Sequence, residues 1–301
     1  MEWFDENPDL IFSGETTKNF TGRLKHFDSV SELPRINLLC EDKLIAIKLI
    51  NTLAWFENGL TGLNLRFGWL NEDSHEITDV FDDETIFVGK SAYCNSFEKI
   101  FGSNTCKISR KARDKNIHIA YQRHFGYHGN PRSLSLGDIR KRMNYVDPLL
   151  RNVDGIFFFL DAIRKQDSNV ENAFVSGMNI DEACIVARYA GMSQSNKLIY
   201  FNIGEGSITD ESSQVTALLI WYYLEGSGNK NIEAIEHKNN HTYMVNNPYF
   251  ENPVKFIKTN ITGRWWYQHP EDNFFIPCTE DDYIAISEGR IPDNFVLTSV
   301  H

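Results

Sequence analysis

Asp161 is the residue of this 301-residue chain whose position points most directly to chemistry. It follows the apolar run 155–160, which has the composition of a buried strand. Open α/β sheets bind ligands beyond the carboxyl ends of their strands, so a carboxylate in this place is available to a metal ion or a substrate. A single acid after a strand is also common as a helix cap or loop residue, and both roles stay open for Asp161.

A cluster of histidines forms the second candidate site. The strand-like run 117–121 leads into Arg123, and His118, His124 and His128 all fall on even positions. If the chain stays extended, the three imidazole groups share one face. No carboxylate stands among them, so the pattern favours contact with an anion or a partner over a metal site.

Two short motifs resemble known sites but lack a required residue. The D-x-H spacing of 73–75 is that of a metal motif, yet Ile77 stands where its last Asp would be, and a solvated acidic loop is the simpler interpretation. The triplet Gly-Lys-Ser at 89–91 follows a strand run and precedes a helical run, as in a phosphate-binding loop. Glu84 stands where that loop requires its first glycine, so a plain strand-to-helix turn is expected.

Strand-like and helical runs alternate along most of the chain. The expected strands lie near 36–40, 63–69, 85–88, 117–121, 155–160 and 197–201. The expected helices lie near 41–54, 92–101, 136–142, 179–190 and 217–224. Gly191 and Gly226 are interpreted as helix stops, and Pro148 as an interruption. The alternation predicts a three-layer α/β/α fold with a mainly parallel sheet covered on both faces.

The organisation of the chain predicts one irregular N-terminal segment, 1–34, and a single α/β domain, 35–301. After a polar stretch, the C-terminal part shows short strand runs near 242–245 and 254–257, then an aromatic loop and a final helix near 279–288.

The aromatic loop contains Arg264, Trp265, Trp266 and Tyr267, residue types that dominate interface hot spots. Two interpretations are open: these residues mediate self-association or a protein contact, or the rings cap the chain's own sheet.

Composition narrows the classes of partner. A net charge of −11 argues against nucleic acid or an anionic membrane surface. No window approaches the roughly 18 apolar residues of a membrane span, and the acidic N-terminus does not resemble a signal peptide. The five cysteines are widely spaced and contain no C-x-x-C pair, so neither a zinc ribbon nor a redox motif is expected, and a reducing cytoplasm is the simplest compartment.

The order of elements between 153 and 226 resembles the C-terminal part of the arginase (ureohydrolase) superfamily, and most closely its bacterial formimidoylglutamase-like branch. That branch has S-x-D-x-D-A-I at a strand end and W-Y-F-x-E-G in a later helix, where this chain has F-F-F-L-D-A-I at 157–163 and W-Y-Y-L-E-G at 221–226. Its tail carries R-W-W and I-P-C-x-x-x-D-Y, matched at 264–266 and 276–283. The resemblance covers roughly 133–290 and implies an arginase-like α/β/α fold.

The resemblance also implies a catalytic site, from which this sequence departs. An active ureohydrolase holds two manganese ions through two His and four Asp, because water needs metal ions to lower its pKa from about 15.7. The expected G-G-x-H falls near 86–91, which has no His, and the expected D-A-H-x-D falls near 106–113, which is basic. Of the D-x-D pair only Asp161 remains, with Phe159 in place of the other Asp.

Three functions follow from these departures. The sequence favours a non-catalytic interaction or scaffold subunit that needs no cofactor. The second is a manganese-dependent hydrolase of a guanidino or formimino C–N bond with relocated ligands such as His75, His118, His124 and Asp161. The third is a protein that binds a small molecule in the same pocket without metal.

Overall fold

The computed structural model describes residues 2–3, 35–53, 56, 64–70, 83–102, 104–127, 129–230, 240–268 and 274–292. The strands of the main sheet are β1 (Glu2–Trp3), β2 (Arg35–Cys40), β3 (Asn64–Trp69), β4 (Glu84–Gly89), β5 (Thr105–Ile108), β6 (Ile117–Tyr121), β7 (Leu134–Ser135), β8 (Gly155–Phe159) and β9 (Leu198–Asn202). The helices around it are α2 (Lys43–Leu53), α3 (Cys94–Phe101), α4 (Leu136–Lys141), α5 (Val146–Leu150), α6 (Lys165–Ser168), α7 (Ile180–Gly191) and α8 (Asp210–Lys230).

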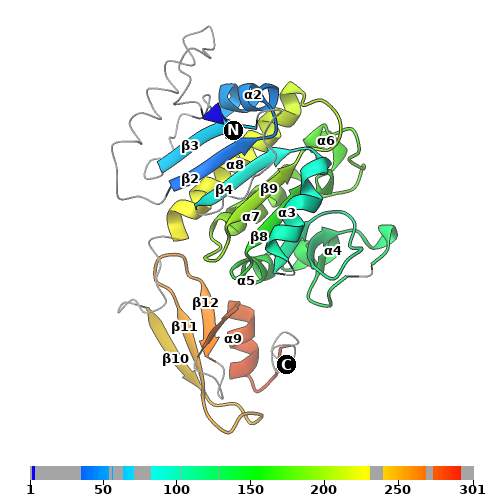
Figure 1. The fold of residues 1–301 in the computed structure, drawn as a ribbon. Helices are drawn as coiled ribbons and strands as arrows, with labels where there is room; N and C mark the ends of the chain where they lie inside the picture. Colours follow the sequence, from blue (N-terminus) through cyan, green and yellow to red (C-terminus); the bar gives the residue numbers. More distant parts are fainter. Residues whose placement is uncertain are drawn as a thin grey trace.

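The main sheet has the order β1-β3-β2-β4-β9-β8-β5-β6-β7. Only the short β1, inside the segment expected to be irregular, is antiparallel to its neighbour; the other pairs are parallel. Figure 1 shows α2, α7 and α8 on one face of the sheet and α3 on the other. The predicted three-layer α/β/α fold with a mainly parallel sheet is therefore confirmed.

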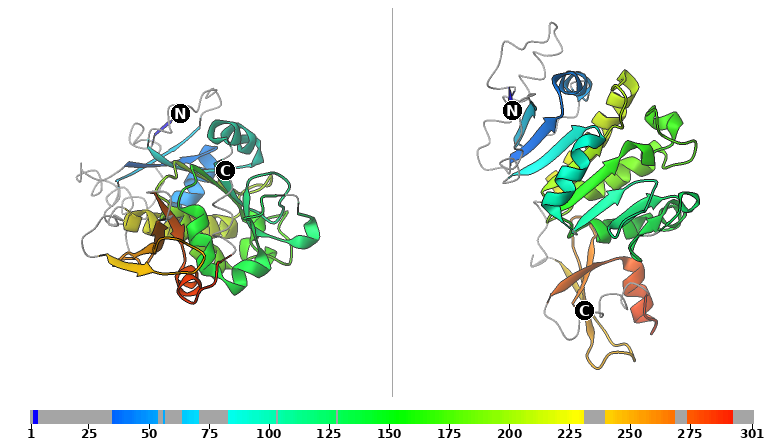
Figure 2. Two further views of the ribbon diagram at one scale, coloured as in Figure 1. Left: turned by 90° about the horizontal axis from the view of Figure 1, so that it is seen from below. Right: turned by 45° about the vertical axis from the view of Figure 1, so that its right-hand side comes forward.

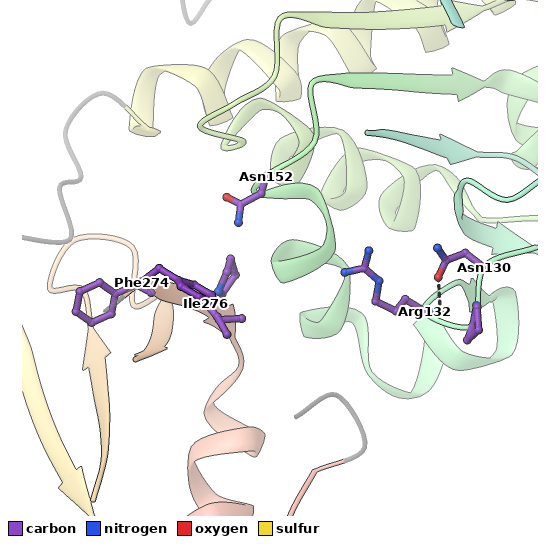
Figure 3. A pocket seen from close by; sticks show the side chains of 8 residues that line it. Asn130, Arg132, Asn152, Phe274 and Ile276 are labelled. Carbon is purple, nitrogen blue, oxygen red and sulfur yellow. Dashed lines mark hydrogen bonds between the residues drawn. The ribbon is translucent and has the colours of Figure 1, made fainter. Parts of the chain in front are cut away.

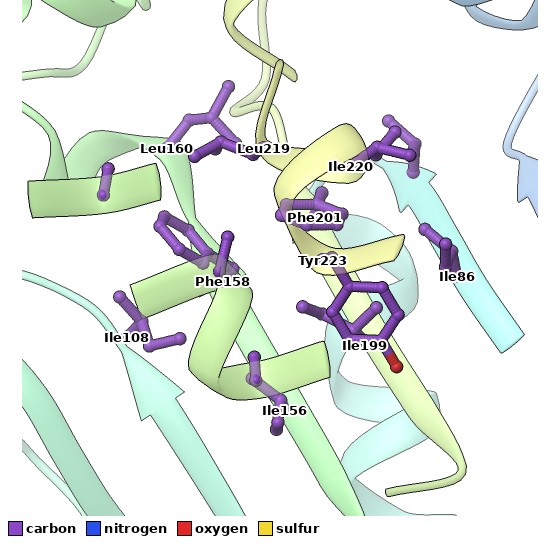
Figure 4. Packing of buried hydrophobic residues seen from close by; sticks show 14 of the residues in the cluster. Ile86, Ile108, Ile156, Phe158, Leu160, Ile199, Phe201, Leu219, Ile220 and Tyr223 are labelled. Atoms are coloured by element: carbon purple, nitrogen blue, oxygen red, sulfur yellow. The ribbon is translucent and has the colours of Figure 1, made fainter. Parts of the chain in front are cut away.

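The central strands of the main sheet are buried because helices cover both of its faces. Every residue of β5, β6 and β9 is buried, as expected for strands of a parallel sheet. On the α8 face, Phe158 and Phe201 lie in one buried cluster with Leu219 and Ile220 (Figure 4). On the α3 face, Phe157 and its neighbours form a second, aromatic cluster. The core thus fixes the positions of the strand ends.

Two glycines allow α7 and α8 to pack closely. A Cβ atom at Gly191 would lie 1.9 Å from the carbonyl oxygen of Tyr223, and one at Gly226 would lie 2.2 Å from that of Arg188. The expectation that Gly226 ends its helix is wrong, because α8 continues to Lys230. Glycine is required there for the approach of two backbones, which the sequence pattern of one helix does not reveal.

Two helix boundaries show how local sequence sets the fold. Asn179 caps α7: its side chain accepts a hydrogen bond from the Glu182 N–H, and the Glu182 carboxylate accepts one from the Asn179 N–H. Pro148 does not interrupt a long helix, because α4 ends at Lys141 and Pro148 lies in the first turn of the separate α5. In a first turn its missing N–H donor has no cost. No helix in the described ranges is both long and apolar enough to cross a membrane.

A second sheet follows α8. Its strands are antiparallel and run in the order β10 (His241–Val245), β11 (Val254–Lys258), β12 (Trp265–Gln268) and β13 (Phe275–Cys278). Helix α9 (Glu280–Ser287) packs on it, and both lie at one end of the molecule (Figures 1 and 2). The aromatic loop expected around Trp265 is therefore a strand, paired with β11 and β13.

Candidate functional site

Asp161 lies at the carboxyl edge of the main sheet, in the 3-10 turn η6 (Leu160–Ala162) that follows β8. Arg110 follows the neighbouring strand β5 and reaches the same place. Its Nε atom lies 3.0 Å from Oδ2 of Asp161, and the two side chains are 14% and 26% exposed. The carboxylate that the sequence singles out is therefore paired with a cation from its own chain.

The guanidinium group of Arg110 is also covered by an aromatic ring. Its Cζ atom lies 5.2 Å from the centre of the Phe125 ring, which stands edge-on to Phe174 with the two centres 5.5 Å apart. Burial raises the pKa of Asp161, while the positive charges of Arg110 and Lys111 act in the opposite direction. The pair is thus partly buried, with Phe125 against the guanidinium group.

Phe159, at the other position of the D-x-D pair, is a packing residue. It is half-buried against the aromatic cluster of the α3 face that contains Phe157 and Tyr200. A phenyl ring has no lone pair for a metal ion, so this position contributes only apolar contact.

The segment after β4 is a turn into the short helix η3 (Ser91–Tyr93). The Lys90 N–H donates to a carboxylate oxygen of Glu41, and the Tyr200 hydroxyl donates to the Lys90 carbonyl. The amide of Asn202, at the end of β9, donates to Ser91 Oγ at 3.2 Å. These hydrogen bonds hold the ends of the strands together through polar groups of the turn. The segment is thus a strand-to-helix connection, as expected.

His118 is buried in β6 and both of its ring nitrogens are occupied. Nε2 lies 2.9 Å from Oδ1 of Asp114, and Nδ1 lies 3.1 Å from Oγ of Ser109. Lys107 Nζ lies 2.7 Å from carboxylate oxygens of both Asp114 and Glu98. The hydrogen bond from His118, together with Lys107, holds the pKa of Asp114 well below its usual range. This network fastens the loop 109–116 onto the sheet.

The chain does not stay extended after β6, so the condition under which the histidines would share a face is not met for His118 and His124. Strand β6 ends at Tyr121, Ala120 has a φ of 67°, and Arg123 and His124 lie in the exposed 3-10 turn η4 (Arg123–Phe125). The turn directs His124 toward Phe125, 4.4 Å away between ring centres, and not toward His118. His128 and the motif 73–75 lie outside the described residues.

The donor set at this edge does not fit two divalent cations. In the part of the chain that the structure describes, no three His, Cys, Asp or Glu side chains are grouped to hold a metal ion. Asp161 supplies one carboxylate, and Arg110 and Lys111 bring positive charge to the same place. A metal ion bound there would have to displace the guanidinium and would meet like charge.

A polar cavity of about 260 Å³ lies at the same edge of the sheet. It is lined by α6 and the loop between β9 and α8, including Lys165, Asn169, Glu171, Glu205 and Thr209. Both signs of charge are present around it. A metal-free ligand could use this cavity.

The cluster at 264–267 is internal to the chain. Trp265, Trp266 and Tyr267 are at most 5% exposed. Arg264 and Arg151 both pair with the buried carboxylate of Asp147, at 2.7 Å from Oδ1 and 3.0 Å from Oδ2.

This arrangement joins the second sheet to the main one. Arg151 lies over the Trp266 ring, with 4.3 Å from Cζ to the ring centre, and its guanidinium donates to the Trp265 carbonyl. The burial agrees with the interpretation that the rings cap the chain's own sheet. A contact with a partner through these rings would require at least one exposed Trp in the single chain, and neither Trp265 nor Trp266 is exposed.

No protein-family model and no curated protein matches this chain. Solved structures do resemble it. The formiminoglutamase of Trypanosoma cruzi, crystallised in oxidized form with Mn²⁺, shares 12% identity at a TM-score of 0.51, covering 69% of this chain and 98% of that one. The agmatine ureohydrolase of Thermoplasma volcanium shares 11% identity at a TM-score of 0.51, covering 75% and 98%. The chain has the arginase/ureohydrolase fold.

Proposed function

We propose that this chain is a non-catalytic protein of the ureohydrolase fold that acts as an interaction or scaffold subunit. One observation carries the proposal: the Arg110 guanidinium lies 3.0 Å from the Asp161 carboxylate, the one acid left of the D-x-D pair. An internal cation thus stands where the resemblance places a metal ion. Similar solved structures include a manganese-containing formiminoglutamase. We therefore propose that this chain has kept the fold and lost the metal-dependent chemistry.

The charge balance of the edge supports the proposal. Two Mn²⁺ ions carry four positive charges, which a ureohydrolase offsets with several carboxylates and a hydroxide. Of the two D-x-D positions at this edge only Asp161 is an acid, and it is already paired with Arg110. Without metal ions, water keeps a pKa of about 15.7 and supplies no hydroxide at neutral pH.

The surface above the ion pair supports a protein contact. Phe174 and its chain neighbour Val175 are 43% and 66% exposed, and Phe174 lies beside Phe125 and the exposed His124 of η4. We call Phe174, Val175, Phe125 and His124 the edge patch. The basic Arg123 is exposed in the same turn. Arg123 is ion-paired with Asp138, at 3.7 Å, so the rim of the patch is polar and carries both signs of charge. Apolar surface with a polar rim is typical of interaction sites.

The hydrolase alternative would need ligands from elsewhere in the chain. Of its candidates, His118 has both nitrogens engaged and Asp161 is paired, which leaves His124 and His75. The metal-free ligand alternative has the 260 Å³ cavity. Among the described residues, no contact favours the hydrolase or the metal-free ligand alternative over an interaction role.

The catalytic half is tested by hydrolysis assays after loading with Mn²⁺. Ammonia and urea release would be measured with formimino and guanidino compounds, using wild type, Asp161→Asn and His75→Ala. The proposal expects no release above the protein-free control. Release that requires Mn²⁺ and disappears in either variant would establish the hydrolase instead.

The interaction half is tested by affinity purification from the organism of origin. Phe174→Ser/Val175→Ser alters the edge patch, and Tyr249→Ser, at a residue 67% exposed in the C-terminal region, is the matched control. A partner must be retained by wild type and by the control, and lost with the edge-patch variant. Equal recovery in all three samples, or no partner in any, counts against this half.

A further inference from the structure

A cleft separates the main sheet from the second sheet, at the edge opposite to Asp161. It consists of two adjoining cavities of about 510 and 220 Å³. Both are lined by Arg132 and Asn152 from the main sheet side and by Ile276 and Pro277 of β13. Arg132 precedes β7 and Asn152 precedes β8, so the cleft lies where these strands begin. It is therefore separate from the site proposed above.

Two polar side chains face this cleft without a partner in the described part of the chain. Figure 3 shows Arg132 and Asn152 extending from the main body toward the side that carries Phe274 and Ile276. The Arg132 N–H donates to Oδ1 of Asn130 at 2.9 Å, which holds the backbone of its loop. Neither the guanidinium group nor the Asn152 amide forms a hydrogen bond or ion pair within the described residues. Both are exposed, and so are available to a ligand.

The inner cavity is mostly apolar. Its walls include Ile117, Leu134, Pro148, Leu149, Val153, Tyr267, Ile276 and Pro277. Sites for small organic molecules combine such apolar walls with a few placed polar groups. Arg132 supplies a cation beside this apolar interior. The combination favours a molecule with one negatively charged end and an apolar body.

Asp282 is the one carboxylate among the residues around the inner cavity, and it is already satisfied. It is 2% exposed, and its Oδ2 accepts hydrogen bonds from the N–H and the hydroxyl of Thr279, both at 2.8 Å, as the cap of α9. Tyr145 lies 3.4 Å from its other oxygen. Asp282 is therefore engaged within the protein, whereas Arg132 lines both cavities and is the charged group available to a ligand.

We propose that this cleft binds a small organic carboxylate with an apolar body. The carboxylate would accept hydrogen bonds from the planar guanidinium of Arg132, which matches carboxylate geometry, and from the Asn152 amide. The apolar body would lie against Ile276, Pro277 and Leu149. Nothing in this proposal depends on whether the opposite edge is catalytic.

The test uses phenylacetate as the probe, with isothermal titration on the full chain. Phenylacetamide has the same shape without the charge, and acetate has the charge without the ring. Arg132→Gln removes the guanidinium, and Arg113→Gln, at another exposed arginine, is the matched control. Phenylacetate should bind wild type and the control equally, and should bind Arg132→Gln about tenfold more weakly or worse, as expected for loss of a charge-assisted hydrogen bond.

Four outcomes would overturn the proposal: no binding of phenylacetate to wild type, equal binding to Arg132→Gln, equal binding of phenylacetamide, or equal binding of acetate or inorganic phosphate. The last would show a general anion site without an apolar part. Asp161→Asn should bind phenylacetate as wild type does, which separates this result from the outcome at the opposite edge. Thermal unfolding of each variant without ligand checks that the fold is retained.

Discussion

The Arg110–Asp161 pair should show a large coupling energy in a double-mutant cycle. The cycle consists of Arg110→Gln, Asp161→Asn and the double variant, each unfolded in urea at pH 7. Arg110→Gln leaves a partly buried carboxylate without its cation, which is the costly change. Asp161→Asn leaves a guanidinium that still contacts the Phe125 ring, which is the milder one.

The magnitude follows from the geometry. At 3.0 Å the attraction of two unit charges is about 5.5 kcal/mol at an effective dielectric constant of about 20, and about 1.4 kcal/mol in water. The side chains are 14% and 26% exposed, so a value of about 2 kcal/mol is expected. We expect a loss of about 2 kcal/mol for Arg110→Gln and little change for Asp161→Asn and the double variant, and hence a coupling of about 2 kcal/mol.

The pH dependence supplies a second readout of the same pair. Burial raises the pKa of Asp161 despite Arg110 and Lys111, so ionisation costs stability as pH rises from about 3.9 through the folded value. Arg110→Gln removes a positive charge that lowers the pKa of Asp161. The folded-state pKa of Asp161 should therefore be higher in this variant, and the loss of stability should continue to higher pH. The gap between wild type and Arg110→Gln should therefore be smallest near pH 4 and largest at pH 7. A coupling below about 0.5 kcal/mol, with no change in pH dependence, would refute the pair as an electrostatic unit.

Three further substitutions test the internal packing. Asp147→Asn leaves Arg151 and Arg264 buried without their shared carboxylate and should cost about 3–5 kcal/mol in urea unfolding. Gly226→Ala places a methyl group 2.2 Å from a backbone oxygen of α7 and should lower the melting temperature by about 5 °C or more, checked by calorimetry. Trp266→Ala should cost about 3–5 kcal/mol with an unchanged sedimentation coefficient; altered association with unchanged stability would restore the contact interpretation.

The long buried strands are predictable from sequence because each is a run of five or six mostly apolar residues, the pattern expected of a strand buried on both faces. The run that becomes β8 is a clear case, since its apolar residues are covered on both faces. Strands β5 and β7 have four and two residues, too few for a pattern to emerge. Strand β12 was expected as a loop, and it is a strand because it pairs with β11 and β13, a pairing that its own short sequence does not reveal.

The candidate site was less predictable because its contacts join distant segments. The sequence identifies Asp161, but its partner Arg110 stands 51 positions earlier and meets it only through the pairing of β5 with β8. Asp114 lies close to His118 in sequence, yet the contact requires the loop 109–116 to fold back over the sheet. An acid four residues before a buried histidine was the available signal. Residues four apart are neighbours on a helix, whereas in a loop the same spacing does not predict a contact.

The most direct test of the central claim is the manganese content of the chain. Purified protein would be incubated with excess Mn²⁺ near pH 8, desalted and analysed by plasma mass spectrometry, with Asp161→Asn in parallel. We expect far less than one Mn per chain in both samples, because Arg110 already neutralises the acid that a metal would need. About two Mn per chain in wild type, lost in Asp161→Asn, would contradict the account.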